Sequence, residues 1–439
     1  MNSPPNPSHG DCPSLGIAER VRSSSRAQRG DPDCRGLRPR NDDQRKSPWD
    51  AALKTPLWTS PFRPFYLLGT AYGLLLMLVW MGAYAGFWSF PSVGPSPWLW
   101  HGHEMVFGFA AAIISGIVLT ALPSWAGTEE ISGGRLALLV GLWLAGRLAL
   151  IAPLPALLGA VLDCALFPVM AVLLTPQLLR VNNRNYRWLL LVLAGLFAAN
   201  LVFHAGRLLA DPVLAVLGLR LAIYSIILLY VLKAGVLTPI FTGNALRESG
   251  RGGDIPFIPW FDALAAASVV ALAGVDLAGL PSPWIGAAAL AACLIHGARL
   301  ARWRGWRVAD VPLLAAMHLG YLWLVLAFAL RAGAELSGAL PAIAWLHAFN
   351  VGALGLMMLG LMTRVTLYHT GRALQLPPLL PAAYGLMFAA AVLRVAVTLC
   401  ALGSAWLALS MLLWAAPFAI YLALFGAMLW RPSLPRAAA

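Results

Sequence analysis

Twelve stretches of mainly apolar residues follow one another through this chain, each about 20 residues long, the length that a helix needs to cross a bilayer. Charged or Pro- and Gly-rich breaks separate them. They cover residues 65–88, 100–122, 135–152, 155–175, 188–209, 213–239, 260–280, 284–302, 312–332, 340–363, 378–400 and 405–430. We therefore predict an all-α, polytopic integral membrane protein with about 12 transmembrane helices.

The charged residues are few and unevenly placed. Only 11% of the 439 residues are charged, against about 25% in soluble domains. This share excludes a soluble enzyme, a DNA-binding protein and a secreted disulfide scaffold. Residues 1–63 hold 18 of the 49 charged residues. We predict a disordered polar and basic tail over residues 1–60, a membrane domain over 61–432 and a short C-terminal tail over 433–439.

The arginines orient the predicted helices. Connections after even-numbered stretches are rich in arginine, whereas those after odd-numbered stretches hold little more than Arg207 and Arg331. Cytoplasmic loops carry an excess of Lys and Arg. This pattern predicts that both termini are cytoplasmic. The net charge of +13 is then a signal of topology and not of nucleic-acid binding.

Seven of the eight histidines lie in or beside the predicted helices. At 1.5 Å per residue, His101, His103, His204 and His347 share one outer layer, contributed by three helices. Such a layer is able to bind a metal ion or haem, since imidazole suits iron, copper and zinc. His318 enters from the cytoplasmic side and would serve a second site. The five cysteines form no Cys-x-x-Cys motif, so any cofactor needs other ligands.

Other intramembrane polar residues suggest partners. Arg147 and Asp163 lie at similar depth on the two arms of a tight hairpin, which predicts an internal ion pair. Asn200, His204, Arg207 and Asp211 share one helical face that must point at protein or water.

His101 and His103 are separated by one residue and would point to nearly opposite sides of a helix. They would face one ligand only if the helix begins after Gly102. His103, the deeper residue, is the first choice as a ligand.

A faint internal match links the second and tenth predicted helices. Aligning His103 with His347 brings Gly108 onto Gly352 and Gly116 onto Gly360. Chance matches are common in helices rich in Gly, Ala and Leu, so the alignment alone does not establish a repeat.

Three motifs resemble the NnrS family of bacterial inner-membrane proteins. They are Pro61-Phe-Arg-Pro-Phe65, His101-Gly-His-Glu-Met105 and the stretch from Met362 through Arg364 to His369-Thr-Gly-Arg372. The resemblance covers roughly residues 56–430. Two features depart from the family, namely the long tail and Tyr368, where we expect a glycine.

The resemblance implies a twelve-helix inner-membrane protein that carries haem and copper and acts in nitric-oxide metabolism or nitrosative stress. The expected metal ligands are His103, His204, His347, His101 and His318. Asn350 or Glu104 would bond the free nitrogen of a ligating imidazole. Arg364, His369 and Arg372 would bind an anionic group such as a haem propionate. The expected partners are the lipid bilayer and nitric oxide or a related small molecule, with no nucleic acid.

The sequence identifies neither an electron donor nor a proton route, so it leaves open whether the protein is an enzyme. Two other functions are compatible with these residues. A secondary transporter of a small anion or solute is the main alternative, with Arg220, Lys233 and Arg394 as buried cations. A structural or assembly subunit, whose histidines only pack, is the third.

Overall fold

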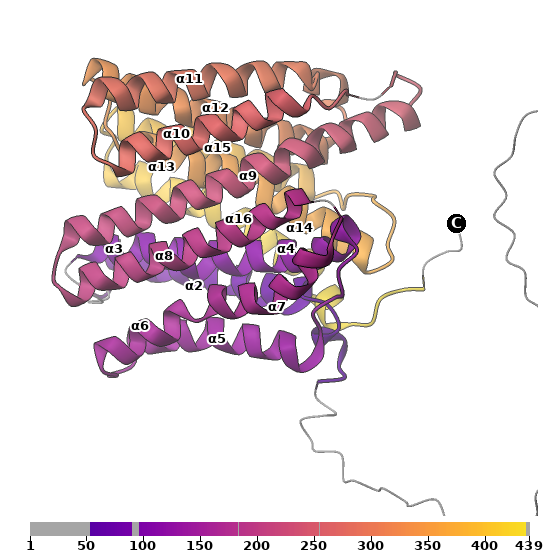
Figure 1. The fold of residues 1–439 in the computed structure, drawn as a ribbon, viewed down its shortest axis with the longest axis horizontal. Coiled ribbons are helices and arrows are strands. Elements are labelled where there is room, and N and C mark those ends of the chain that lie inside the picture. Colours follow the sequence, from indigo (N-terminus) through magenta and orange to yellow (C-terminus); the bar gives the residue numbers. More distant parts are fainter. Residues whose placement is uncertain (1–52, 90–95, 183, 254, 436–439) are drawn as a thin grey trace, which may run out of the picture. The chain divides into compact units, whose positions relative to one another are not determined.

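The computed structural model describes residues 53–89, 96–182, 184–253 and 255–435. These residues form a helical bundle without a β-strand (Figure 1). Twelve of its helical segments are long and apolar enough to cross a membrane, which confirms the predicted fold class. The predicted tail over residues 1–60 falls mostly outside the described residues. Its last part contains the short helix η1 (Pro56–Trp58).

The twelve segments are built from fifteen α-helices and two π-helices, and two more 3₁₀ turns lie in the loops. In chain order the segments are α2 (Phe62–Tyr84); α3 (Pro97–His103), η2 (Glu104–Ala110) and α4 (Ala111–Ala126); α5 (Gly133–Ile151); α6 (Ala156–Cys164) and α7 (Leu166–Arg180); α8 (Trp188–Leu208); α9 (Pro212–Glu248); α10 (Pro259–Leu277); α11 (Ser282–Arg302); α12 (Pro312–Ser337); α13 (Ala344–His347), η5 (Ala348–Leu354) and α14 (Gly355–His369); α15 (Leu380–Leu399); and α16 (Ser404–Trp430).

Local chemistry explains where several helices begin or break. Asp211 caps α9, since its carboxylate accepts from the backbone N–H groups of Val213 and Leu214. The fourth segment breaks at Ala165 because Pro168 has no N–H to donate to the carbonyl of Cys164. The sixth segment runs nine residues beyond its predicted end, because α9 stays helical past the end of the apolar stretch.

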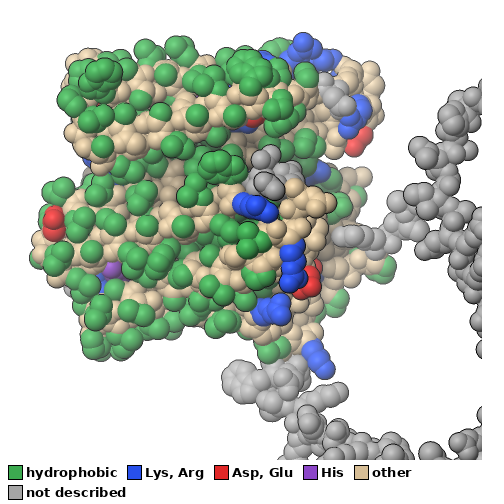
Figure 2. All heavy atoms as spheres, in the orientation of Figure 1, with side chains coloured by type: hydrophobic (Ala, Val, Ile, Leu, Met, Phe, Trp, Pro, Cys, Tyr) green, Lys and Arg blue, Asp and Glu red, His purple; other side chains and the backbone are tan. Residues whose placement is uncertain are grey.

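The loops after the even-numbered segments all lie at one end of the bundle, which we call the basic end; it is the right-hand end in Figure 1. Figure 2 shows Lys and Arg side chains gathered there, while hydrophobic side chains cover the flank in view. The second and tenth segments are the most enclosed, because 94% and 78% of the residues in their most apolar 18-residue stretches are buried. They form the core, and both begin at the opposite end.

Both core segments contain a π-helical stretch of seven residues directly after a histidine. The first, η2, follows His103, and the second, η5, follows His347. These are the two histidines that the sequence alignment superimposes. The shared π-helix adds a structural match to the sequence match. Single π-helical turns inside α-helices occur often at functional sites.

Candidate metal sites

A buried cluster of two imidazoles and one carboxylate lies between α3, α6 and α8. Nε2 of His103 is 3.1 Å from Oδ2 of Asp163, and Nε2 of His204 is 2.8 Å from the same oxygen. Each of the three residues offers a ligand atom, and these atoms lie within 4.8 Å of one another. All three side chains are at most 5% exposed. We call His103, Asp163 and His204 the buried cluster.

Polar partners surround the buried cluster on every helix that faces it. Nδ1 of His103 donates to Oε1 of Glu104 at 2.9 Å. Asn200 donates through Nδ2 to Oδ2 of Asp163 at 2.9 Å, and its Oδ1 lies 3.0 Å from Nε2 of His103. Arg147 donates to Glu104 at 2.8 Å and also to Asp163, which confirms the predicted ion pair.

The hydroxyl of Tyr72 also donates to Glu104. The sequence did not single out Tyr72, because one tyrosine in an apolar helix gives no signal of its own. Glu104 was predicted as a partner for a ligating imidazole, and it occupies that position beside His103.

The charges and protons of the buried cluster do not balance without a further cation. Two carboxylates, Glu104 and Asp163, face the single guanidinium of Arg147. Both ring nitrogens of His103 also face oxygen atoms, and a neutral imidazole donates through only one nitrogen. A proton or a metal ion beside Nε2 would supply the missing positive charge.

A glycine in α5 allows its backbone to pack closely against Asp163 of α6. A Cβ atom on Gly146 would lie 2.6 Å from Oδ1 of Asp163, so the hairpin of α5 and α6 depends on a glycine there. On the other side, the ring of Phe203 stacks on His103 with the ring centres 4.3 Å apart. The cluster is therefore packed closely on both sides and is suited to a single ion.

A second histidine pair lies between α3 and α13. His101 and His347 are close enough for a charge on one to act on the other, and the guanidinium of Arg394 acts on both. His101 stacks on Trp80 with the ring centres 4.3 Å apart. Nδ1 of His347 donates to the carbonyl of Ile343 at 3.2 Å. Both imidazoles are partly exposed. We call these two residues the His101–His347 pair.

The predicted layer of four imidazoles is thus divided into two pairs. The second segment begins at Pro97, so His101 and His103 both lie within α3 and point to different sides of it. His103 contacts His204 of α8, with the ring centres 5.5 Å apart, and His101 is within range of the charge of His347. Residue spacing predicts a shared depth for the four residues but not which of them face each other.

The remaining predicted residues of this region make local contacts. Asn350 donates to the carbonyl of Leu346 at 2.8 Å and does not bond His347 in this structure. His318 is buried near the basic end, where its Nε2 lies 2.9 Å from the hydroxyl of Thr242. The structure therefore keeps His318 apart from both histidine pairs.

The predicted anion-binding segment lies at the basic end. The guanidinium of Arg364 lies over the ring of Phe241, 3.8 Å from its centre, and the ring of His369 is 5.9 Å from that of Phe62. Arg372 donates to the carbonyl of Thr370 at 3.4 Å. His347 and Arg364 are 17 residues apart, about 25 Å along a helix. One haem could not contact both.

The same segment holds the end of the chain. Ser433 donates to the carbonyl of His369 at 3.0 Å, and the N–H of Leu434 donates to that of Thr370 at 2.9 Å. Arg63 is 2% exposed and donates to the carbonyls of Leu429 and Arg431. The first and third sequence motifs therefore meet and fix the C-terminal end of α16.

The comparisons with known proteins agree with these motifs. Residues 56–433 match a family profile described as NnrS protein, and this range covers nearly the whole chain. No curated protein matches the chain.

Proposed function

The chain belongs to the NnrS family, and on this premise we propose that it binds copper and haem in the bacterial inner membrane and acts on nitric oxide or protects the cell from it. One observation carries the proposal: His103, Asp163 and His204 offer three buried ligand atoms within 4.8 Å of one another. His101 and His347, which are within range of each other's charge, offer imidazoles for a second metal group.

The buried cluster fits a copper ion. It offers two imidazole nitrogens and one carboxylate oxygen, and imidazole is a common ligand of copper. Glu104 bonds the other nitrogen of His103, the arrangement that orients a metal-ligating histidine. The excess carboxylate charge beside Arg147 favours a bound cation in a region where an unpaired charge is costly.

The His101–His347 pair fits haem. Because Nδ1 of His347 donates to the carbonyl of Ile343, its Nε2 is left to ligate iron. Arg394 acts on both imidazoles and would neutralise a haem propionate there. When bound, haem supplies an iron centre able to bind nitric oxide, and copper supplies one-electron redox chemistry.

The absorption spectrum and metal content of four histidine variants test this assignment. Cells supplied with haem and copper should yield detergent-purified protein with a Soret band and bound copper. We expect H101A and H347A to lose the Soret band and keep copper. H103A and H204A should lose copper and keep the band.

His296 provides a matched control. It is fully buried at the basic end and bonds Tyr321, so H296A should keep both signals. Wild-type protein with neither a Soret band nor copper would contradict the proposal. Loss of both signals in every one of the four variants would contradict the division into two sites.

The surroundings of the three cations that a transporter would use favour metal binding over anion transport. Arg220, which we predicted to be buried, has a side chain that is 42% exposed. Arg220 lies 3.5 Å from Asp276, and Arg394 donates to Thr398 at 2.8 Å. The ammonium of Lys233 lies 4.8 Å from the ring centres of both Trp125 and Tyr186. These are three separate environments, whereas a transporter needs its substrate contacts at one site near the midplane.

A further inference from the structure

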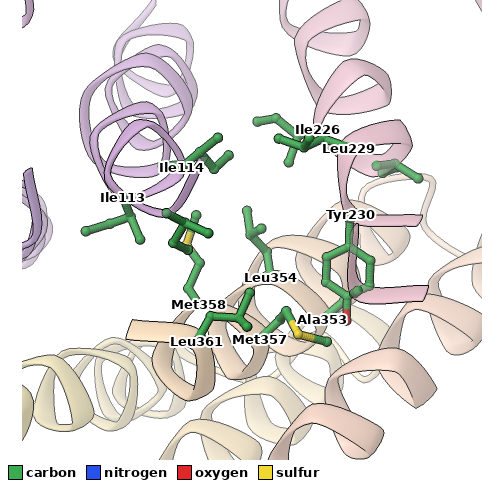
Figure 3. Packing of buried hydrophobic residues seen from close by; sticks show 14 of the residues in the cluster. Ile113, Ile114, Ile226, Leu229, Tyr230, Ala353, Leu354, Met357, Met358 and Leu361 are labelled. Carbon is green, nitrogen blue, oxygen red and sulfur yellow. The ribbon is translucent and has the colours of Figure 1, made fainter. Parts of the chain in front are cut away.

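An apolar cavity of about 50 Å³ lies in the core of the bundle, between α4, α9 and the η5–α14 segment. Figure 3 shows its walls: Ile114 comes from the second segment, Ile226 and Leu229 from α9, and Leu354 and Met358 from the tenth segment. The two core segments that carry His101, His103 and His347 therefore supply two of its walls, and α9 supplies the third.

The size of the cavity limits what it can hold. A single water needs about 10–15 Å³, and an engineered apolar cavity of about 150 Å³ binds benzene or xenon. At about 50 Å³, this cavity has room for a diatomic molecule or a xenon atom.

The lining disfavours water. A buried water needs two to four polar partners, and apolar cavities of this kind stay dry. The polar groups among the lining residues are few, chiefly Lys233 and Tyr230. The Lys233 ammonium lies between the rings of Trp125 and Tyr186, so aromatic contacts already engage it. The chemistry of the lining suits a neutral, apolar occupant.

The position of the cavity relates it to the histidine pairs. Ile114 follows His103 by eleven residues and Leu354 follows His347 by seven, which correspond to about 16 Å and 10 Å along a helix. Nitric oxide is small and uncharged, and it enters apolar surroundings readily. We propose that this cavity is a binding site for a small, apolar gas molecule; naming nitric oxide as the natural occupant rests on the function proposed above.

Xenon is the probe, because it is apolar, of suitable size and visible by its anomalous scattering. Crystals of the full chain would be pressurised with xenon. We expect xenon density between Ile114, Leu229 and Leu354 in the wild type. A234L should abolish it, since Ala234 is 2% exposed and lines the cavity. M358A should increase the occupancy by enlarging the cavity.

The control is A419L, which makes the same substitution at an exposed position of α16 and should keep the xenon site. M358A guards against a variant that fails only because it is overpacked. Absence of xenon in the wild type, when M358A binds it, would overturn the proposal. So would xenon that stays in place in A234L.

Failure of this inference can be told from failure of the proposed function. Xenon needs neither haem nor copper, so protein without a Soret band could still bind it in the cavity. Conversely, protein with both metal groups and no xenon site would overturn the cavity alone. In haem-loaded protein, A234L should also remove a slow phase from the return of nitric oxide after its photolysis from the iron, because the dissociated molecule could no longer occupy the cavity, with the Soret band of the resting protein unchanged.

Discussion

Arg147 joins the carboxylate of Asp163, in the candidate copper site, to that of Glu104 beside it. Its Nη1 donates to Glu104 at 2.8 Å and its Nη2 donates to Asp163, and the side chain is 6% exposed. A guanidinium can serve two carboxylates at once because its donors form a planar fork, whereas an ammonium is a single point of charge.

We predict that R147A strongly destabilises the protein. Removing one partner of a buried ion pair costs about 3–5 kcal/mol, because the other charge stays buried and unpaired. Here two carboxylates would be left without their guanidinium. R147K should fall between the variant and the wild type, since a lysine keeps the charge but not the fork. Thermal unfolding of detergent-purified protein measures both effects.

Arg220 offers the comparison. Its side chain is 42% exposed and lies 3.5 Å from Asp276, a buried carboxylate that also pairs with Arg331 at 2.7 Å. Removing Arg220 would leave Asp276 paired with the guanidinium of Arg331. R220A should therefore lower the unfolding temperature much less than R147A. Equal losses in the two variants would show that burial does not set the importance of Arg147.

For pairs of residues, the sequence predicted only the depth of each residue in the membrane. Depth in the membrane is readable from residue spacing, and it was enough to pair Arg147 with Asp163 across a short hairpin. The partnership of His103 with His204 depends on how α3 and α8 are rotated toward each other. That rotation comes from the packing of the whole bundle and has no signature in either helix.

At the scale of elements, the α8–α9 hairpin is held together by two glycines. A Cβ atom on Gly206 would lie 2.3 Å from the backbone nitrogen of Ala215. One on Gly218 would lie 2.5 Å from the nitrogen of Phe203 and 2.7 Å from the carbonyl oxygen of Ala199. Small residues allow membrane helices to approach this closely. The approach also sets the place of His204, the residue after Phe203.

We predict that G218A weakens metal binding at the buried cluster. The new methyl group meets backbone atoms that cannot rotate away, so α8 must shift and His204 must shift with it. Overpacking of this kind costs about 1–3 kcal/mol. Copper content after dialysis against a graded chelator measures the change, and we expect copper to be lost at a lower chelator concentration than in the wild type.

Gly274 supplies the control for this helix contact. It lies in α10, where nothing is within 4 Å of its added Cβ, so G274A should retain copper as the wild type does. If G218A kept copper equally well, the close approach of α8 and α9 would not be what positions His204.

The two π-helical stretches are the elements that the sequence did not predict. Apolar periodicity locates a helix, but a shift of its hydrogen bonds from i→i+4 to i→i+5 leaves the composition unchanged. The helix boundaries were predicted more closely, because charged and Pro- or Gly-rich residues mark the ends of the apolar stretches. The excess length of α9 was missed because that helix continues beyond its apolar residues.

At the scale of the whole molecule, the arginines of the loops and the two histidine pairs lie at opposite ends of the bundle. The basic end holds the arginines of the loops (Figure 2). The opposite end holds the helix ends that carry both histidine pairs. Loops rich in Lys and Arg stay on the cytoplasmic side during insertion. We infer that the basic end faces the cytoplasm and that both proposed metal sites lie toward the outer face.

Cysteine accessibility tests this orientation. In a chain whose five native cysteines are replaced by serine, A339C and Q375C would place one thiol in an exposed loop at each end. Residue 339 follows α12 at the opposite end, and residue 375 lies between α14 and α15 at the basic end. A membrane-impermeant maleimide applied to intact spheroplasts should label A339C and spare Q375C. Detergent permeabilisation should expose both. Labelling of Q375C alone before permeabilisation would reverse the inferred orientation. The proposed haem and copper sites would then lie toward the cytoplasm, and the nitric oxide that reaches them would come from inside the cell.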